Sequence, residues 1–60
     1  LSKKDFVMRV KICRKEAKES RYWLKLIEVN GESSEKKRQL LIQEATELMK
    51  IFGAVLEKTK

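Results

Sequence analysis

Apolar residues recur with a helical period along the first half of the chain. Their spacing alternates between four and three residues, which predicts one amphipathic helix over about residues 3–29. The residues of this apolar seam are Phe6, Val10, Cys13, Ala17, Ser20, Leu24 and Ile27. Because small side chains occupy its middle, the seam is suited to close approach by another helix.

The second half predicts another amphipathic helix, over about residues 35–58. Its main stripe is formed by Leu41, Ala45, Leu48, Phe52 and Val55. Neighbouring positions widen this stripe on both sides, namely Ile42, Met49 and Leu56 on one and Leu40 and Ile51 on the other. At 100° per residue the combined apolar arc is about 200°. One facing helix covers much less than that, so we expect the second helix to need more than one neighbour.

The two helices therefore predict an all-α protein, an antiparallel helical hairpin that forms part of an up-and-down four-helix bundle. We expect the other helices to come from a second copy of the chain or from a part of the protein outside these residues. The one strong break, residues 30–34, contains Asn30 and Gly31, which tolerate the left-handed backbone that closes helices. Ser33 or Ser34 is expected to cap the second helix, and Ser2 the first.

Composition limits the chain to a single module. Sixty residues bury only about 60% of the surface that the unfolded chain exposes. With one cysteine and no histidine there is neither a disulfide pair nor a zinc-type cluster, and small scaffolds of this kind usually rely on oligomerisation. Since the chain begins at Leu1, we expect residues 1–60 to be a fragment or half of a bundle. No apolar run reaches the roughly 20 residues that a bilayer crossing needs, and a lone cysteine favours a cytoplasmic location.

Charge points to an anionic partner. The chain carries a net charge of +6, which favours nucleic acid before acidic proteins or lipid headgroups. Lysines recur at every seventh position of the first helix and, with their neighbours on the wheel, form a ridge away from the apolar seam. The candidate nucleic-acid-binding residues are Lys4, Lys11, Arg14, Lys15, Lys18, Arg21 and Lys25. Two interpretations stay open: a solvated helix face, or a stripe that follows a phosphate backbone.

Acidic residues gather on the opposite flank of both helices. The candidate interface residues on these flanks and beside them are Glu16, Glu19, Tyr22, Trp23, Leu40, Glu44 and Ile51. Carboxylate-bridged metal bundles add a Glu-x-x-His motif, and this chain has no histidine. We therefore predict no metal, no cofactor, no small-molecule substrate and no enzymatic activity, and we expect these glutamates to fix the register of a neighbouring helix.

Adjacent Tyr22 and Trp23 are expected to point about 100° apart and to occupy different environments. Trp23 is typical of a packed helix contact with one polar edge. Tyr22 falls toward the basic ridge, where a base could stack on it beside Lys15 and Lys18, although burial against a neighbouring subunit is the alternative. Cys13 is interpreted as a small hydrophobic residue of the seam.

Three segments resemble a known family: SKKDF (residues 2–6), KEAKESRYWLKLI (residues 15–27) and EATELMKIFGAVLEKTK (residues 44–60). They are similar to the C-terminal half of the bacterial four-helix-bundle proteins encoded by 23S rRNA intervening sequences, a group related to the accessory proteins of diversity-generating retroelements. The family's most recognisable stretch matches Lys18, Glu19, Arg21, Tyr22, Trp23 and Leu24. Family members have two further helices before this half.

The resemblance implies a four-helix bundle that assembles into a homopentamer with a basic surface for RNA or a nucleoprotein partner. It carries over no catalytic motif. The leading hypothesis is thus a non-catalytic homo-oligomer, either that pentamer or a dimer that completes a bundle, which binds structured RNA through the first helix. The alternative is a structural or protein-binding adaptor with no nucleic-acid role, in which Trp23 anchors a partner. A membrane-surface helix is disfavoured because the seam is needed for packing.

Overall fold

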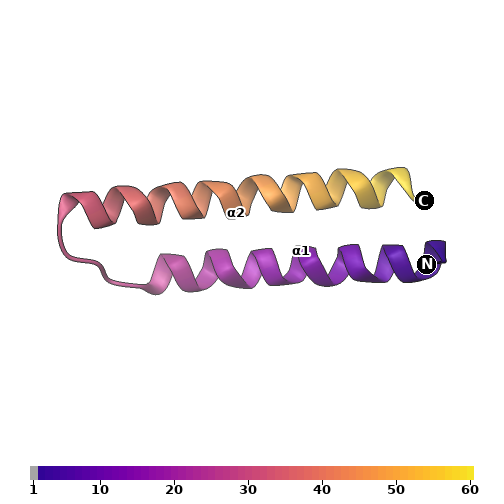
Figure 1. The fold of residues 1–60 in the computed structure, drawn as a ribbon, viewed down its shortest axis with the longest axis horizontal. Coiled ribbons are helices and arrows are strands. Elements are labelled where there is room, and N and C mark those ends of the chain that lie inside the picture. The colour runs from indigo at the N-terminus through magenta and orange to yellow at the C-terminus, as the bar shows by residue number, and fades with distance from the viewer. Residues whose placement is uncertain (1) are drawn as a thin grey trace.

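Two long antiparallel helices joined by one short connection make up the computed structural model, which describes residues 2–60 (Figure 1). Helix α1 runs over Lys3–Leu26 and helix α2 over Glu32–Lys58. The all-α helical hairpin predicted from the sequence is therefore confirmed. The hairpin is a rod of 46 × 15 × 15 Å, with the two chain ends beside each other at one end and the connection at the other (Figure 1).

Ser2 caps the start of α1, as the sequence predicted. Its hydroxyl oxygen accepts a hydrogen bond of 3.1 Å from the Asp5 backbone N–H, which has no partner within the helix. Asp5 itself places a negative charge in the first turn, where the helix dipole favours it. The beginning of α1 is thus fixed by local interactions alone.

The connection lies three residues earlier than the sequence predicted at both of its ends. Helix α1 ends at Leu26, because the backbone is already extended at Ile27, whose β-branched side chain favours that conformation. Helix α2 begins at Glu32, directly after Gly31, whose φ of +92° is open to glycine but not to other residues. Ser33 and Ser34 lie inside the first turn and Gly31 occupies the capping position without a side-chain bond, so the predicted serine cap is wrong.

Arg38 joins α2 to the end of α1. Its Nη1 donates a hydrogen bond of 3.0 Å to the carbonyl oxygen of Leu24, one of the acceptors left unpaired in the last turn of α1. Glu35 holds the same guanidinium in a two-pronged ion pair, with bonds of 3.0 Å to Nε and 2.7 Å to Nη2. Gln39 donates a further bond of 2.9 Å to Glu35. We call these bonds among Arg38, Glu35, Gln39 and Leu24 the clasp. The clasp fixes the start of α2 against the end of α1.

The contact between the helices is narrow. Val10 and Ala45 are the buried hydrophobic residues among residues 2–60. Half-buried side chains complete the contact, from α1 Val7, Ala17, Arg21 and Leu24 and from α2 Ile42, Met49, Phe52 and Leu56.

The predicted seam of α1 is only partly correct. Val10, Ala17 and Leu24 do face α2, but Phe6, Cys13, Ser20 and Ile27 are exposed. Relative to the predicted seam, the observed contact line on α1 is rotated by about 60° toward the basic residues. This angle follows from a separation of 100° between successive residues of a helix. Arginine explains the difference, because two arginines border the observed contact: the Arg21 guanidinium donates to Thr46 and the Arg14 guanidinium lies against Gly53.

The two glycines predict opposite effects of an alanine. Gly31→Ala forces a Cβ onto a backbone region that is nearly restricted to glycine, so we expect a loss of about 1–3 kcal/mol. At Gly53 a new Cβ meets the Arg14 guanidinium at 3.7 Å, an ordinary contact, so Gly53→Ala should gain up to about 1 kcal/mol from helix propensity. Urea unfolding followed by circular dichroism at one fixed chain concentration measures both. Equal effects of the two substitutions contradict this account.

The clasp predicts an acid-sensitive contribution to stability. Hydrogen bonds from Arg38, and then from Gln39, lower the pKa of Glu35 from 4.5 to about 2. Because the pKa is lower in the folded chain, the stabilisation is complete above pH 4.5 and is lost as the pH falls toward 2. Glu35→Gln should lower the melting temperature at pH 7 and flatten its dependence on pH between 4.5 and 2.

Glu32→Gln is the matched control for the clasp. Glu32 lies 3.9 Å from Lys36, and both side chains are more than three-quarters exposed. Exposed pairs of this kind contribute little to stability. Thermal melts of this variant should follow the wild type across the same pH range, and a parallel loss in both variants argues against a special role for Glu35.

Candidate nucleic-acid interface

The excess positive charge lies entirely on one helix. Helix α1 carries nine lysines and arginines against three acidic residues, whereas α2 carries five of each. The imbalance on α1 therefore equals the net charge of the chain, +6. A positive field along the whole of one helix favours an extended polyanion as the partner over a protein surface that carries charges of both signs.

Ion pairs within residues 2–60 are confined to α2 and the residues just after it. The pairs are Glu32–Lys36, Glu35–Arg38, Glu47–Lys50 and Glu57–Lys60. None of them includes a cation of α1. The lysines of α1 thus keep their charge uncompensated, which is the condition for releasing counterions on contact with phosphates.

Most of the predicted basic residues lie together on one side of the hairpin. We define the basic side as Lys11, Arg14, Lys15, Lys18, Arg21 and Lys25. Four of these residues, Lys15, Lys18, Arg21 and Lys25, line a depression of about 590 Å³ with Glu19 and Tyr22. Arg14, Lys15, Lys18 and Arg21 line another of about 550 Å³ with Met49 of α2. Lys4 is exposed near the start of α1, at the end of the same lysine repeat.

Arg14 and Arg21 differ from the lysines because they contact α2. The Nη1 atom of Arg21 donates a hydrogen bond of 3.4 Å to Oγ1 of Thr46, whose hydroxyl donates to the carbonyl of Ile42 at 2.9 Å. The Arg14 guanidinium lies against Gly53, 3.7 Å from where a Cβ would stand. The sequence placed both arginines on a free ridge, but they border the helix contact. Arg21 is half-buried there, whereas Arg14 stays exposed together with the lysines of the basic side.

Tyr22 and Trp23 contact each other, contrary to the prediction that they occupy separate environments. Their ring centroids are 5.6 Å apart at an interplanar angle of 42°. The two side chains are long enough to lean together although their Cα–Cβ bonds diverge. Both remain more than half exposed, and Tyr22 lies in the depression with Lys18 and Lys25. The structure therefore provides an accessible aromatic surface beside free cations.

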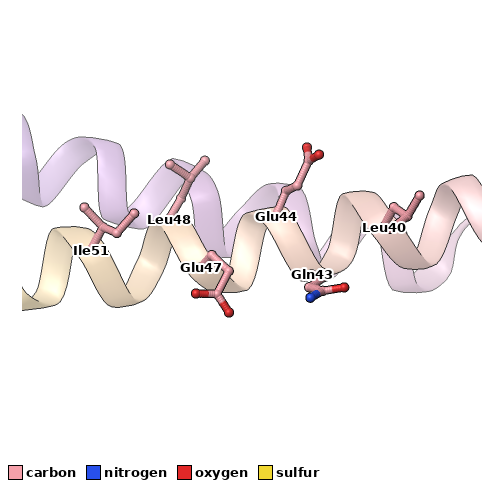
Figure 2. A pocket seen from close by; sticks show the side chains of 6 residues that line it. All are labelled: Leu40, Gln43, Glu44, Glu47, Leu48 and Ile51. Atoms are coloured by element: carbon pink, nitrogen blue, oxygen red, sulfur yellow. The ribbon is translucent and has the colours of Figure 1, made fainter.

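The predicted interface residues of α2 lie together in a groove. Leu40, Glu44 and Ile51 line it with Gln43, Glu47 and Leu48, and its volume is about 510 Å³. Figure 2 shows Leu40, Glu44, Leu48 and Ile51 projecting to one side of α2, away from Gln43 and Glu47. Glu44 thus lies among the apolar side chains of the groove, whereas Glu47 points to the other side of α2 (Figure 2).

The acidic residues of the two helices do not converge. Glu19 lies in the basic depression, Glu16 is exposed on α1, and Glu44 and Glu47 border the groove on α2. No group of three or more His, Cys, Asp or Glu side chains within residues 2–60 is arranged to hold a metal ion. Trp23 is exposed and separate from that groove.

Sequence reasoning missed the residues that set the helix ends and the edge of the basic side. Glu35 and Arg38 were not singled out as a pair, although their i,i+3 spacing on one helix was a usable signal. Thr46 gave no comparable signal, because its partner Arg21 lies on the other helix.

Comparisons with known proteins give no relative. No family model, curated protein or solved structure matches the chain. In the part of the chain that the structure describes, neither helix contains an apolar stretch that could cross a membrane. Charge, aromatic surface and apolar surface, as they are distributed over the hairpin, are therefore the features that indicate a function.

Proposed function

We propose that the chain is a non-catalytic helical module that binds structured RNA through its basic side. The observation that supports this most is that α1 carries the entire net charge and that none of its cations is ion-paired within residues 2–60. Lys4, Lys11, Lys18 and Lys25 repeat every seven residues, which is about 10 Å along the helix axis. The row of four lysines is thus about 30 Å long. An extended nucleic-acid backbone can contact a row of this length, whereas a small anion contacts only one or two of its charges.

The shape of the surface favours the same partner. The depressions along α1 are wide and shallow, and small ligands need concave sites that enclose most of their surface. Contacts to phosphates carry no sequence information, so the proposed binding is set by charge and shape. An unpaired base can stack on Tyr22 between Lys18 and Lys25.

A protein-binding adaptor is the second candidate, and one observation favours it. Trp23 is 63% exposed, the largest exposed fraction among the large hydrophobic side chains of residues 2–60. Exposed tryptophans often anchor protein interfaces. In this role the lysines of α1 only maintain solubility.

Removing the free lysines tests the RNA proposal. The variant Lys11→Gln, Lys15→Gln, Lys18→Gln, Lys25→Gln should weaken binding to a fluorescent RNA hairpin by about 100-fold at low salt. It should also reduce the slope of log affinity against log salt by about 3, since each lost phosphate contact removes about 0.7–0.9. Fluorescence anisotropy across a salt series measures both quantities.

A charge-matched control uses α2. The variant Lys36→Gln, Lys37→Gln, Lys50→Gln, Lys58→Gln also removes four positive charges, but from α2 instead of α1. It should retain most of the affinity, and circular dichroism should show both variants to be helical. If the two variants lose the same RNA affinity, net charge alone explains the loss, and a binding site on α1 is excluded. If the wild type does not bind the hairpin at low salt, the adaptor role becomes the better explanation.

A further inference from the structure

The side of the hairpin opposite the basic side is apolar. The contacts Arg14–Gly53 and Arg21–Thr46 mark the basic side. At 100° per residue, the apolar positions displaced the other way from the helix contact share the opposite side. We define this apolar side as Phe6, Cys13 and Ile27 of α1 with Leu41, Leu48 and Val55 of α2. Phe6, Ile27, Leu41 and Leu48 are each between 45% and 51% exposed.

The exposed area shows how much surface remains to be covered. The chain exposes 5135 Å², whereas a compact monomer of 7.1 kDa exposes about 4,100 Å². The radius of gyration is 14.3 Å, against about 10 Å for a compact domain of this length. A single hairpin is thus about 1,000 Å² short of ordinary burial, and eleven large hydrophobic side chains of residues 2–60 stay exposed.

A second copy fits this deficit in area. A compact particle of twice the mass exposes about 6,800 Å², so two hairpins that reach this value bury about 3,500 Å² in total. That lies within the range of about 2,000–5,000 Å² for obligate homodimers. The apolar side excludes every lysine of the basic side. Arg9 shares the wheel position of Ile27, and Lys37 that of Val55, so two copies that meet there bring only these two cations of each chain near the interface.

We propose that two copies of the chain pack with their apolar sides facing each other and form a four-helix bundle with twofold symmetry. Phe6, Ile27, Leu41 and Leu48 become the core that each hairpin lacks. A twofold interface uses the same patch on both copies, which this single apolar side provides. The two basic sides then lie on opposite outer faces of the dimer. This proposal is independent of the proposed function, because it concerns the other side of the hairpin.

The mass of the purified chain tests the proposal. Sedimentation equilibrium at micromolar concentration should give twice the chain mass of 7.1 kDa. Leu48→Glu places a charge in the centre of the apolar side and should shift the particle to monomer, weakening association by at least about 100-fold. Met8→Glu is the matched control: Met8 is 53% exposed but lies about 140° from Cys13 on the wheel, so this variant should remain a dimer.

A second measurement covers the case in which Leu48→Glu does not fold. The melting temperature of the wild type should rise with chain concentration, because association stabilises the folded state by mass action. A cooperatively folded wild-type monomer at micromolar concentration overturns the proposal, as does a particle of five chains or a loss of the dimer in Met8→Glu. RNA affinity is measured separately, so failure of the dimer and failure of RNA binding are distinguishable.

Discussion

Two helices can touch along only one line, and this constraint shapes the whole hairpin. Each helix buries a single stripe against the other, and here the stripe contains little more than Val10, Ala45 and their half-buried neighbours. Because α2 carries apolar residues over a wide arc, four of its large side chains, Leu40, Leu41, Leu48 and Ile51, stay exposed. The packing of the two helices therefore decides which faces of the hairpin remain accessible to other molecules. Two such faces remain, the basic side and the apolar side.

The arginines separate these two faces. Arg14 and Arg21 lie along the junction of α1 and α2, where the Arg14 guanidinium lies against Gly53 and the Arg21 guanidinium donates to Thr46. Arginine suits this position because its planar group packs against a helix without losing its charge. Lysine ammonium groups are more strongly hydrated and stay on the open surface of α1. One rim of the contact is thus basic, while the other consists of Phe6, Leu41 and Leu48.

The helix ends show how far local sequence signals reach. Ser2 and Asp5 were sufficient to predict the first cap, since both partners lie within one turn. Gly31 marked the break, but the clasp from Arg38 to Leu24 depends on where α1 ends and cannot be read from spacing alone.

For the candidate interface, the sequence likewise predicted which residues share a side of each helix, but not which side of α1 faces α2. The seven-residue lysine repeat identified the charged side. Leu40, Glu44 and Ile51 line one groove, as their wheel positions indicated, and their interface role stays a prediction. The facing direction of α1 was misjudged by about 60° because arginine was counted as purely polar. Four residues of the predicted seam do not face α2. Of these, Phe6, Cys13 and Ile27 belong to the open apolar side, and the fourth is the polar Ser20.

The proposed dimer and the proposed RNA binding constrain each other geometrically. With the apolar sides joined, the basic sides point away from each other across the thickness of a four-helix bundle. One straight duplex cannot contact both sides, so the number of phosphates engaged by a single duplex stays that of one hairpin. The salt dependence of binding to a short duplex is then set by the lysines of one α1. Longer RNA can engage both sides when it bends around the bundle or when two segments approach it. In that case the second contact gains from its high effective concentration, without any new interaction.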